Sequence, residues 1–148
     1  MTMLNVRRLG DLAGTDPAAD PVRRLIRVAT AATLADSGYI HAQLYIDGYR
    51  YIHVVGVLFL IQAAVSFALT ALLLVGAILR PPALVGIAAG ATALGALGGF
   101  AASRTFGVFG FTEHGWQPAP QSLESVLVEV ATLLLLTVAP ARTLRRRA

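Results

Sequence analysis

The stretch VVGVLFLIQAAVSFALTALLLVGAIL, residues 54–79, decides the class of this chain. It contains no charged residue, and it exceeds the roughly 20 apolar residues that a helix needs to cross a bilayer. A second uncharged stretch, residues 83–103, follows Arg80, Pro81 and Pro82. Because a proline pair ends one helix and can open the next, we expect a tight hairpin between two membrane-spanning helices.

Two further stretches are less apolar. Residues 122–141 are interrupted by Glu124 and Glu129, and residues 24–46 by Asp36 and His41. One acid at the centre of a spanning helix costs about 2.5–3.5 kcal/mol on insertion scales, which surrounding apolar side chains can offset. We therefore predict four spanning helices, at about residues 24–46, 53–79, 83–103 and 122–141. For the first of these, the alternative is an amphipathic helix lying on the membrane surface.

The arginines favour four crossings. With both termini in the cytoplasm, only Arg50 and Arg104 of the 12 cationic residues lie outside. The inner set is Arg7, Arg8, Arg23, Arg24, Arg27, Arg80, Arg142, Arg145, Arg146 and Arg147. Cytoplasmic segments are enriched in arginine and lysine, whereas three crossings would place one basic end of the chain outside. The sequence thus predicts a multi-pass plasma-membrane protein, an all-α four-helix bundle over residues 22–141, with cytoplasmic tails at 1–21 and 142–148.

The composition agrees with this class. Of the 148 residues, 56% are hydrophobic and 14% charged, and the mean hydropathy is +0.69. Soluble domains average about 45–50% apolar and about 25% charged residues. The net charge of +4 could suggest nucleic acid as a partner. However, the arginines cluster beside apolar stretches, so we interpret them as topology anchors and expect no nucleic-acid binding.

Four glycines in the third predicted helix form two pairs with small-xxx-small spacing, Gly86 with Gly90 and Gly95 with Gly99. Such pairs let another helix approach closely. We expect close packing inside the bundle, with a homodimer face as the alternative.

Polar side chains recur on one face of three predicted helices. They are Thr30, Ser37 and His41 in the first, Gln62, Ser66 and Thr70 in the second, and Ser122, Ser125, Glu129 and Thr132 in the fourth. The first helix is polar over a wider arc, because Asp36, Tyr39 and Gln43 form a second group about 140° away from the first. Residues three, four or seven positions apart share a helix face, so these stripes can converge on the bundle interior. Hydrogen bonds between helices are the simplest role for the hydroxyl and amide groups, at about 0.6 kcal/mol each.

Ionisable groups inside a membrane point to function, because burying them is expensive. Counted from the outer helix ends at 1.5 Å per residue, His41 lies roughly 7–8 Å deep and Glu129 roughly 9 Å deep. Asp36 lies roughly 15 Å deep, at the level of Gln62. We predict that these four residues line one interior cavity that opens outward and serves as a ligand or proton site. A structural hydrogen bond between His41 and Glu129 is the alternative.

Enzymatic chemistry has no clear sequence signature here. Without cysteine, thiolate metal sites, iron–sulfur clusters and cysteine nucleophiles are excluded. His41, His53 and His114, with Glu113, lack the close spacing of a metal site, and no matched histidine pair suggests haem. We therefore predict no catalytic residue, no metal site and no cofactor.

Several motifs carry a family resemblance: HAQLY at 41–45, GYR at 48–50, GVLFL at 56–60 and GVFGFTE at 107–113. Over about residues 24–141 the chain resembles small uncharacterised four-helix membrane proteins of high-GC actinobacteria. The resemblance implies a plasma-membrane location and transfers no activity. The layout is also similar to that of small multidrug-resistance transporters, with an acid in the first helix, but that family's glutamate motif is absent.

Two classes of function follow from these features. The first is a non-catalytic membrane component, either an accessory or scaffold subunit or a binder of a lipid or quinone-like molecule. The second is a small proton-coupled transporter that works as an oligomer, with Asp36 and Glu129 as proton carriers. Both classes have the bilayer as a partner, together with a second membrane protein or further copies of this chain.

Overall fold

The computed structural model describes residues 21–76 and 83–145, with side chains as far as residue 138. Its helices are α2 (Pro21–Asp47), the short 3₁₀ helix η1 (Tyr49–Tyr51), α3 (Val55–Gly76), α4 (Ala83–Thr105) and α5 (Gln121–Arg145). An isolated bridge between Val108 and Phe111 is the only β pairing over these residues. The predicted all-α class is confirmed.

Three of the helices are long and apolar enough to cross a membrane: α3, α4 and the Gln121–Val138 part of α5. Large apolar side chains remain exposed on all three, among them Leu72, Ile87 and Leu134. Soluble monomers rarely expose apolar surface so extensively, whereas lipid covers it at no cost. The structure is therefore that of a helical membrane protein.

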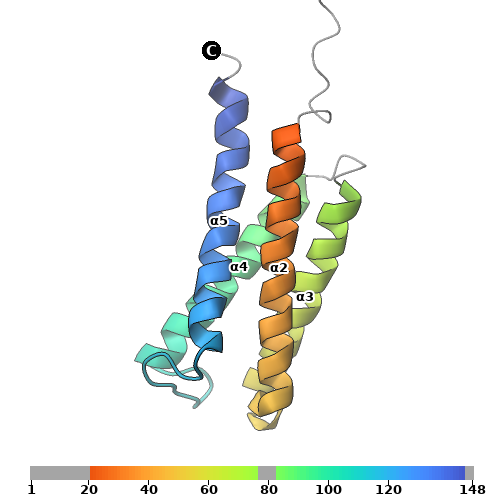
Figure 1. Cartoon of the computed structure of the whole chain (residues 1–148). Coiled ribbons are helices and arrows are strands. Elements are labelled where there is room, and N and C mark those ends of the chain that lie inside the picture. Colours follow the sequence, from red (N-terminus) through yellow and green to blue (C-terminus); the bar gives the residue numbers. More distant parts are fainter. Residues whose placement is uncertain (1–20, 77–82, 146–148) are drawn as a thin grey trace, which may run out of the picture.

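Helix α2 is less apolar and is not among these three candidate spans. It nevertheless runs along the bundle beside α3 and α5, with which it makes extensive contacts (Figure 1). Its buried face carries Thr30, Ser37 and His41 alongside apolar residues, so part of its polarity is turned inward. Helix composition thus supports three crossings, and the fourth depends on how α2 packs.

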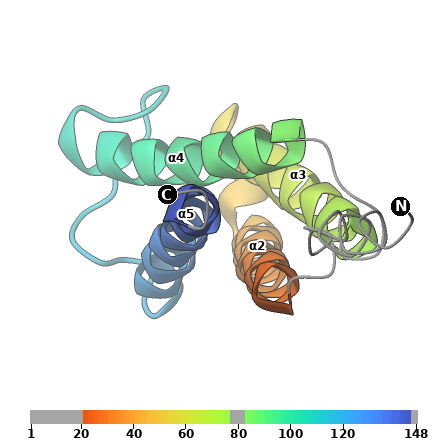
Figure 2. The same cartoon turned by 90° about the horizontal axis from the view of Figure 1, so that it is seen from above.

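Helix α4 crosses obliquely behind the other three helices and contacts α3 and α5 (Figure 2). An apolar core lies where α2, α3 and α4 approach one another. It consists of Ala31, Leu34, Leu69, Leu73, Val85 and Ala89. The core stabilises one half of the bundle, while the polar stripes occupy much of the remaining interior.

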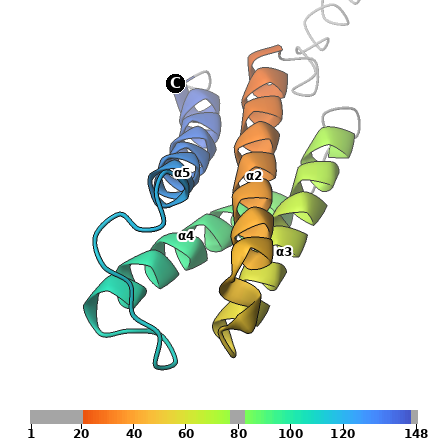
Figure 3. The ribbon, with the colours of Figure 1, turned by 60° about the horizontal axis from the view of Figure 1, so that its bottom comes forward.

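The bundle has two distinct ends. At the arginine end, α2 and α4 begin, and the first two turns of α2 carry Arg23, Arg24 and Arg27. At the loop end lie η1 and the connection of residues 106–120, which joins α4 to α5 (Figure 3). The alternating directions of the four helices place the first residue of α2 and the last of α5 at the same end.

The predicted helix limits differ from the observed ones mainly in α5. This helix continues to Arg145 and so includes Arg142 and Arg145, which belong to the predicted cytoplasmic tail. Leucine and arginine are good helix formers, so the helix does not stop where the apolar stretch stops. The predicted hairpin at Pro81 and Pro82 and the chain before residue 21 lie outside the described residues.

Candidate functional site

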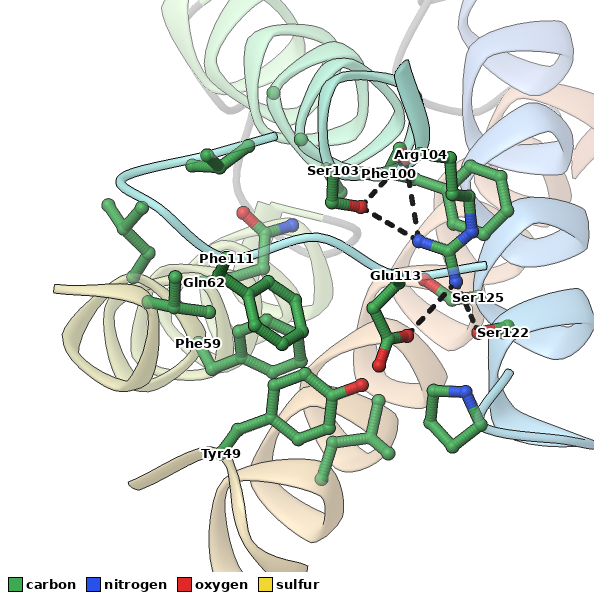
Figure 4. A pocket seen from close by; sticks show the side chains of 18 residues that line it. Tyr49, Phe59, Gln62, Phe100, Ser103, Arg104, Phe111, Glu113, Ser122 and Ser125 are labelled. Atoms are coloured by element: carbon green, nitrogen blue, oxygen red, sulfur yellow. Dashed lines mark hydrogen bonds and ion pairs between the residues drawn. The ribbon is translucent and has the colours of Figure 1, made fainter. Parts of the chain in front are cut away.

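A pocket of about 140 Å³ opens at the loop end, between α3, α4, α5 and the 106–120 connection (Figure 4). Four aromatic rings line it: Tyr49, Phe59, Phe100 and Phe111. Its polar lining residues are Gln62, Ser103, Arg104, Glu113, Ser122 and Ser125. A few convergent polar groups on an apolar wall are typical of small-molecule sites.

The roof of the pocket is a tight turn in the 106–120 connection. Val108 and Phe111 exchange two backbone hydrogen bonds, at 2.8 and 2.9 Å. Gly107 permits the turn because it has a φ of 82°, and a side chain there would collide with Thr112 at 2.9 Å. The turn directs the Phe111 ring toward Tyr49, with 5.7 Å between the ring centroids.

Arg104, at the end of α4, fastens this connection to the bundle. Its guanidinium lies 3.7 Å above the centre of the Phe100 ring. It donates hydrogen bonds to Glu113 Oε2 (3.3 Å), Ser122 Oγ (3.0 Å), Ser103 Oγ (2.8 Å) and the carbonyls of Gly115 (2.9 Å), Phe100 (3.4 Å) and Gln117. These contacts occupy the N–H donors of the guanidinium group. Arg104 therefore holds the connection in position and is not available as a ligand-binding donor.

Tyr49 joins the pocket to the buried histidine through stacked rings. Its ring stacks on Phe59 at 4.5 Å, and Phe59 in turn lies 5.3 Å from His41. The hydroxyl of Tyr49 points toward the Glu113 carboxylate (Figure 4). Burial, and then the negative charge of Glu113, raise the pKa of Tyr49 above its ordinary value, so this phenol stays protonated.

Two glycines of α4 form part of the pocket wall with their backbone alone. Gly95 and Gly99 line it, and a Cβ built on either would meet no atom within 4 Å. Within this chain they therefore make space instead of packing against a helix. Gly86 and Gly90 do face another helix, since their added Cβ atoms would lie 3.8 and 3.6 Å from Leu136 of α5.

The predicted pair of His41 and Glu129 meets through a third residue. Ser37 Oγ donates a hydrogen bond of 2.5 Å to Glu129 Oε1, while the Ser37 carbonyl lies 2.8 Å from His41 Nδ1. Ser37 and Glu129 are fully buried, and Glu129 Oε2 has no hydrogen-bond partner. The three residues form a polar centre between α2 and α5, which we call the Glu129 cluster.

Gln62 connects this cluster to the pocket. It lines the pocket, approaches Glu129, and donates a hydrogen bond of 3.3 Å to the Thr92 carbonyl in α4. The inward orientation predicted for the polar stripes is confirmed by the complete burial of Ser66 in α3 and Thr132 in α5.

Asp36 is not brought to the same interior. It is exposed on the outer face of α2, together with Tyr39, which is 62% exposed. Consecutive helical residues point about 100° apart, so with Ser37 turned inward Asp36 faces outward. The expected convergence of the four residues on one cavity is therefore wrong: Asp36 faces outward, and of the other three only Gln62 is among the residues that line the pocket at the loop end.

Sequence reasoning missed Arg104, Tyr49 and Glu113 as pocket residues. The available signal was Arg104 itself, one of the two arginines expected outside the membrane, followed by an aromatic and glycine-rich connection. Over the described part of the chain, no three histidine, aspartate or glutamate side chains gather as a metal site would require. In comparisons with protein-family models, with curated proteins and with solved structures, nothing matches this chain.

Proposed function

We propose that this chain is a non-catalytic membrane protein that binds the ring of a quinone-like, lipid-soluble molecule in the pocket at the loop end. The observation that carries the proposal is the size and lining of the pocket. A cavity of about 150 Å³ with apolar walls accommodates one benzene ring. The pocket, at about 140 Å³, is therefore suited to a single six-membered ring and too small for a whole lipid.

The charges in the pocket favour a neutral ligand. Arg104 and Glu113 form an ion pair at 3.3 Å and offset each other. The Gln62 amide and the Ser125 hydroxyl line the pocket as groups that suit a ring carbonyl or hydroxyl. Because a quinone carbonyl accepts hydrogen bonds and a quinol hydroxyl donates them, both forms of such a ring find partners here.

The pocket is also open to molecules dissolved in the bilayer. Gly95, Gly99 and Leu58 line it and are themselves exposed on the flank of the bundle. Nearby Leu94 is 59% exposed, so the surface beside the opening is apolar. A ring with an isoprenoid or alkyl tail could enter sideways and leave its tail in lipid.

Binding is expected to quench the fluorescence of Trp116, the single tryptophan of the chain. The Trp116 ring lies 5.6 Å from Phe100, which lines the pocket, and quinone rings quench indole emission at short range. Titration of decylubiquinone into purified protein in mild detergent should give saturable quenching. Gly95→Leu, which fills the pocket, should abolish the saturable part.

The matched control is Gly98→Leu in the same helix. Gly98 has no atom within 4 Å of its Cβ position and does not line the pocket. The fluorescence of the Gly98→Leu variant should show the same saturable quenching by decylubiquinone as that of the wild type. Linear, non-saturating quenching that is equal in all three proteins would contradict the proposal.

We further propose that α2 crosses the membrane, so that both ends of the chain lie in the cytoplasm. Supporting this, α2 runs beside the three apolar helices, and its Ser37 and His41 are buried against them. Twenty-seven residues of helix extend about 40 Å, enough to span the bilayer core. The three arginines near its start suit a cytoplasmic position.

Reporter fusions test this topology. Fusions after residues 20, 81 and 148 should read as cytoplasmic, and fusions after residues 48 and 115 as external, because each crossing reverses the side. If residues 20 and 48 both read as cytoplasmic, α2 lies on the surface and the four-span proposal is wrong.

Proton-coupled transport is the second candidate, and the Glu129 cluster is the observation that favours it. The Glu129 carboxyl group is fully buried and one of its oxygens has no partner, which costs folding free energy. Ionisable groups kept inside a membrane at such a cost commonly mark a proton or ion pathway. Asp36, the other proposed proton carrier, faces away from this cluster. A transport pathway that used both acids would require a neighbouring copy of the chain beside α2.

A further inference from the structure

A second and larger cavity lies at the arginine end, remote from the ring pocket. It is a groove of about 750 Å³ between α2, α4 and α5; Figure 2 shows the arrangement of these three helices from above. Its walls are largely apolar and include Ile26, Ile87, Leu133 and Leu136. Arg23 and Arg27 line the same groove.

Positive charge is concentrated at the mouth of this groove. No aspartate or glutamate is among the described residues that line it. Neither α2 nor α4 has an acidic residue in its first turn, and Ala83, the first residue of α4, is part of the lining. Helix N-termini carry a partial positive charge, so two of them add to the field of the arginines.

The guanidinium group of Arg27 is held in place. Arg27 Nη1 donates a hydrogen bond of 2.9 Å to the carbonyl of Gly76, at the end of α3. A cation at a helix C-terminus is favourable, so this contact fixes the Arg27 side chain beside the groove. The positive charge of Arg27 is thus held at a fixed position beside the groove.

The depth of the groove fits an amphipathic occupant. Ala83, Gly86 and Gly90 line it in succession along α4, and seven residues of helix span about 10 Å. The charged mouth would lie at the level of lipid head groups, and the glycine-lined part within the hydrocarbon. Gly86 and Gly90 line this part of the groove with backbone, and Leu136, the nearest side chain to both, lines the groove opposite them.

We propose that this groove binds an anionic phospholipid. Its phosphate contacts Arg23 and Arg27, and one acyl chain lies along Ile87, Gly90 and Leu133. Planar guanidinium groups suit phosphate because they donate two parallel hydrogen bonds. Basic pockets between membrane helices on the cytoplasmic side bind acidic lipid head groups in this way. The inference is independent of the ring pocket, which lies at the other end of the bundle.

Native mass spectrometry of the full chain in mild detergent tests the proposal. The protein is offered equal amounts of palmitoyl-oleoyl phosphatidylglycerol and palmitoyl-oleoyl phosphatidylcholine. We expect one retained phosphatidylglycerol, preferred roughly 30-fold, as two arginines at a membrane surface would produce. The double variant Arg23→Gln, Arg27→Gln should lose the preference, and Arg50→Gln, at the loop end, should keep it.

Two further variants keep the test decisive. Because Arg27 also caps α3, Arg23→Gln alone is included, and it should weaken the preference while the α3 contact stays intact. Gly90→Leu keeps both arginines and fills the groove, so it should lose the bound lipid. Equal retention of both lipids by the wild type, displacement of the lipid by inorganic phosphate, or a dimer that binds no lipid would overturn the proposal.

Discussion

Arg104→Ala is expected to release the 106–120 connection and to dismantle the pocket beneath it. The side chains of Arg104 and Glu113 are only 15% and 19% exposed, so removing the cation leaves Glu113 nearly buried without its counter-ion. Breaking one partner of a buried ion pair costs about 3–5 kcal/mol, and we expect the lower part of that range because some exposure remains. A thermal melt followed by Trp116 fluorescence should show a clearly lower midpoint and no saturable quinone quenching.

Arg50→Ala is the matched control. Arg50 is exposed and bonds to its neighbour Tyr51 at 2.7 Å, so its loss should leave the melting midpoint unchanged. Arg104→Lys should give an intermediate midpoint, because an ammonium group can donate hydrogen bonds to fewer of the surrounding acceptors than the planar guanidinium group can. If Arg104→Ala has the same melting midpoint as the wild type, the connection is held by other contacts.

Gly56→Ala is expected to separate η1 from α3. The added Cβ would lie 2.6 Å from the Tyr49 carbonyl oxygen and 2.9 Å from Arg50 Cα, both of them backbone atoms. The backbone of η1 must therefore shift, and the Tyr49 ring moves with it off Phe59. Overpacking of this kind costs about 1–3 kcal/mol, and we expect the upper part of that range because no flexible side chain can yield.

Gly98→Ala makes the same chemical change in α4, where the Cβ meets nothing within 4 Å. Alanine is the better helix former by about 0.8–1 kcal/mol, so this variant should melt at the wild-type temperature or slightly above it. The two midpoints, measured in one detergent, isolate the steric effect. Equal melting of Gly56→Ala and Gly98→Ala would show that η1 adjusts freely.

Much of the fold could be predicted from the sequence because it depends on local patterns. Uncharged stretches long enough to cross a bilayer as a helix predicted the positions of the helices. Spacing with a period of 3.6 residues predicted the inward faces that carry Ser66 and Thr132. Depth counting placed His41 and Glu129 at one level, and the structure links both to Ser37. The topology and the actinobacterial resemblance stay predictions.

The rest depends on contacts that no local pattern contains. Arg104 meets Glu113 only because the connection folds back, and Tyr49 joins them from a different segment. Gly95 and Gly99 have the spacing of a packing pair, but the oblique course of α4 leaves them beside open space. Asp36 is a different case, because helical spacing already places it on another face than Ser37 and His41, and only its matching depth assigned it to the interior.

The packing of α2 has a consequence for biogenesis. Among the four long helices described, α2 is synthesised before the others, yet Thr30, Ser37 and His41 on its inner face are shielded by helices made later. Ser37 finds its carboxyl partner in α5, which follows the other three in the chain. Lipid alone is a poor solvent for that face. Stable integration of the first helix must therefore wait for the last, which makes insertion of this small protein a cooperative step.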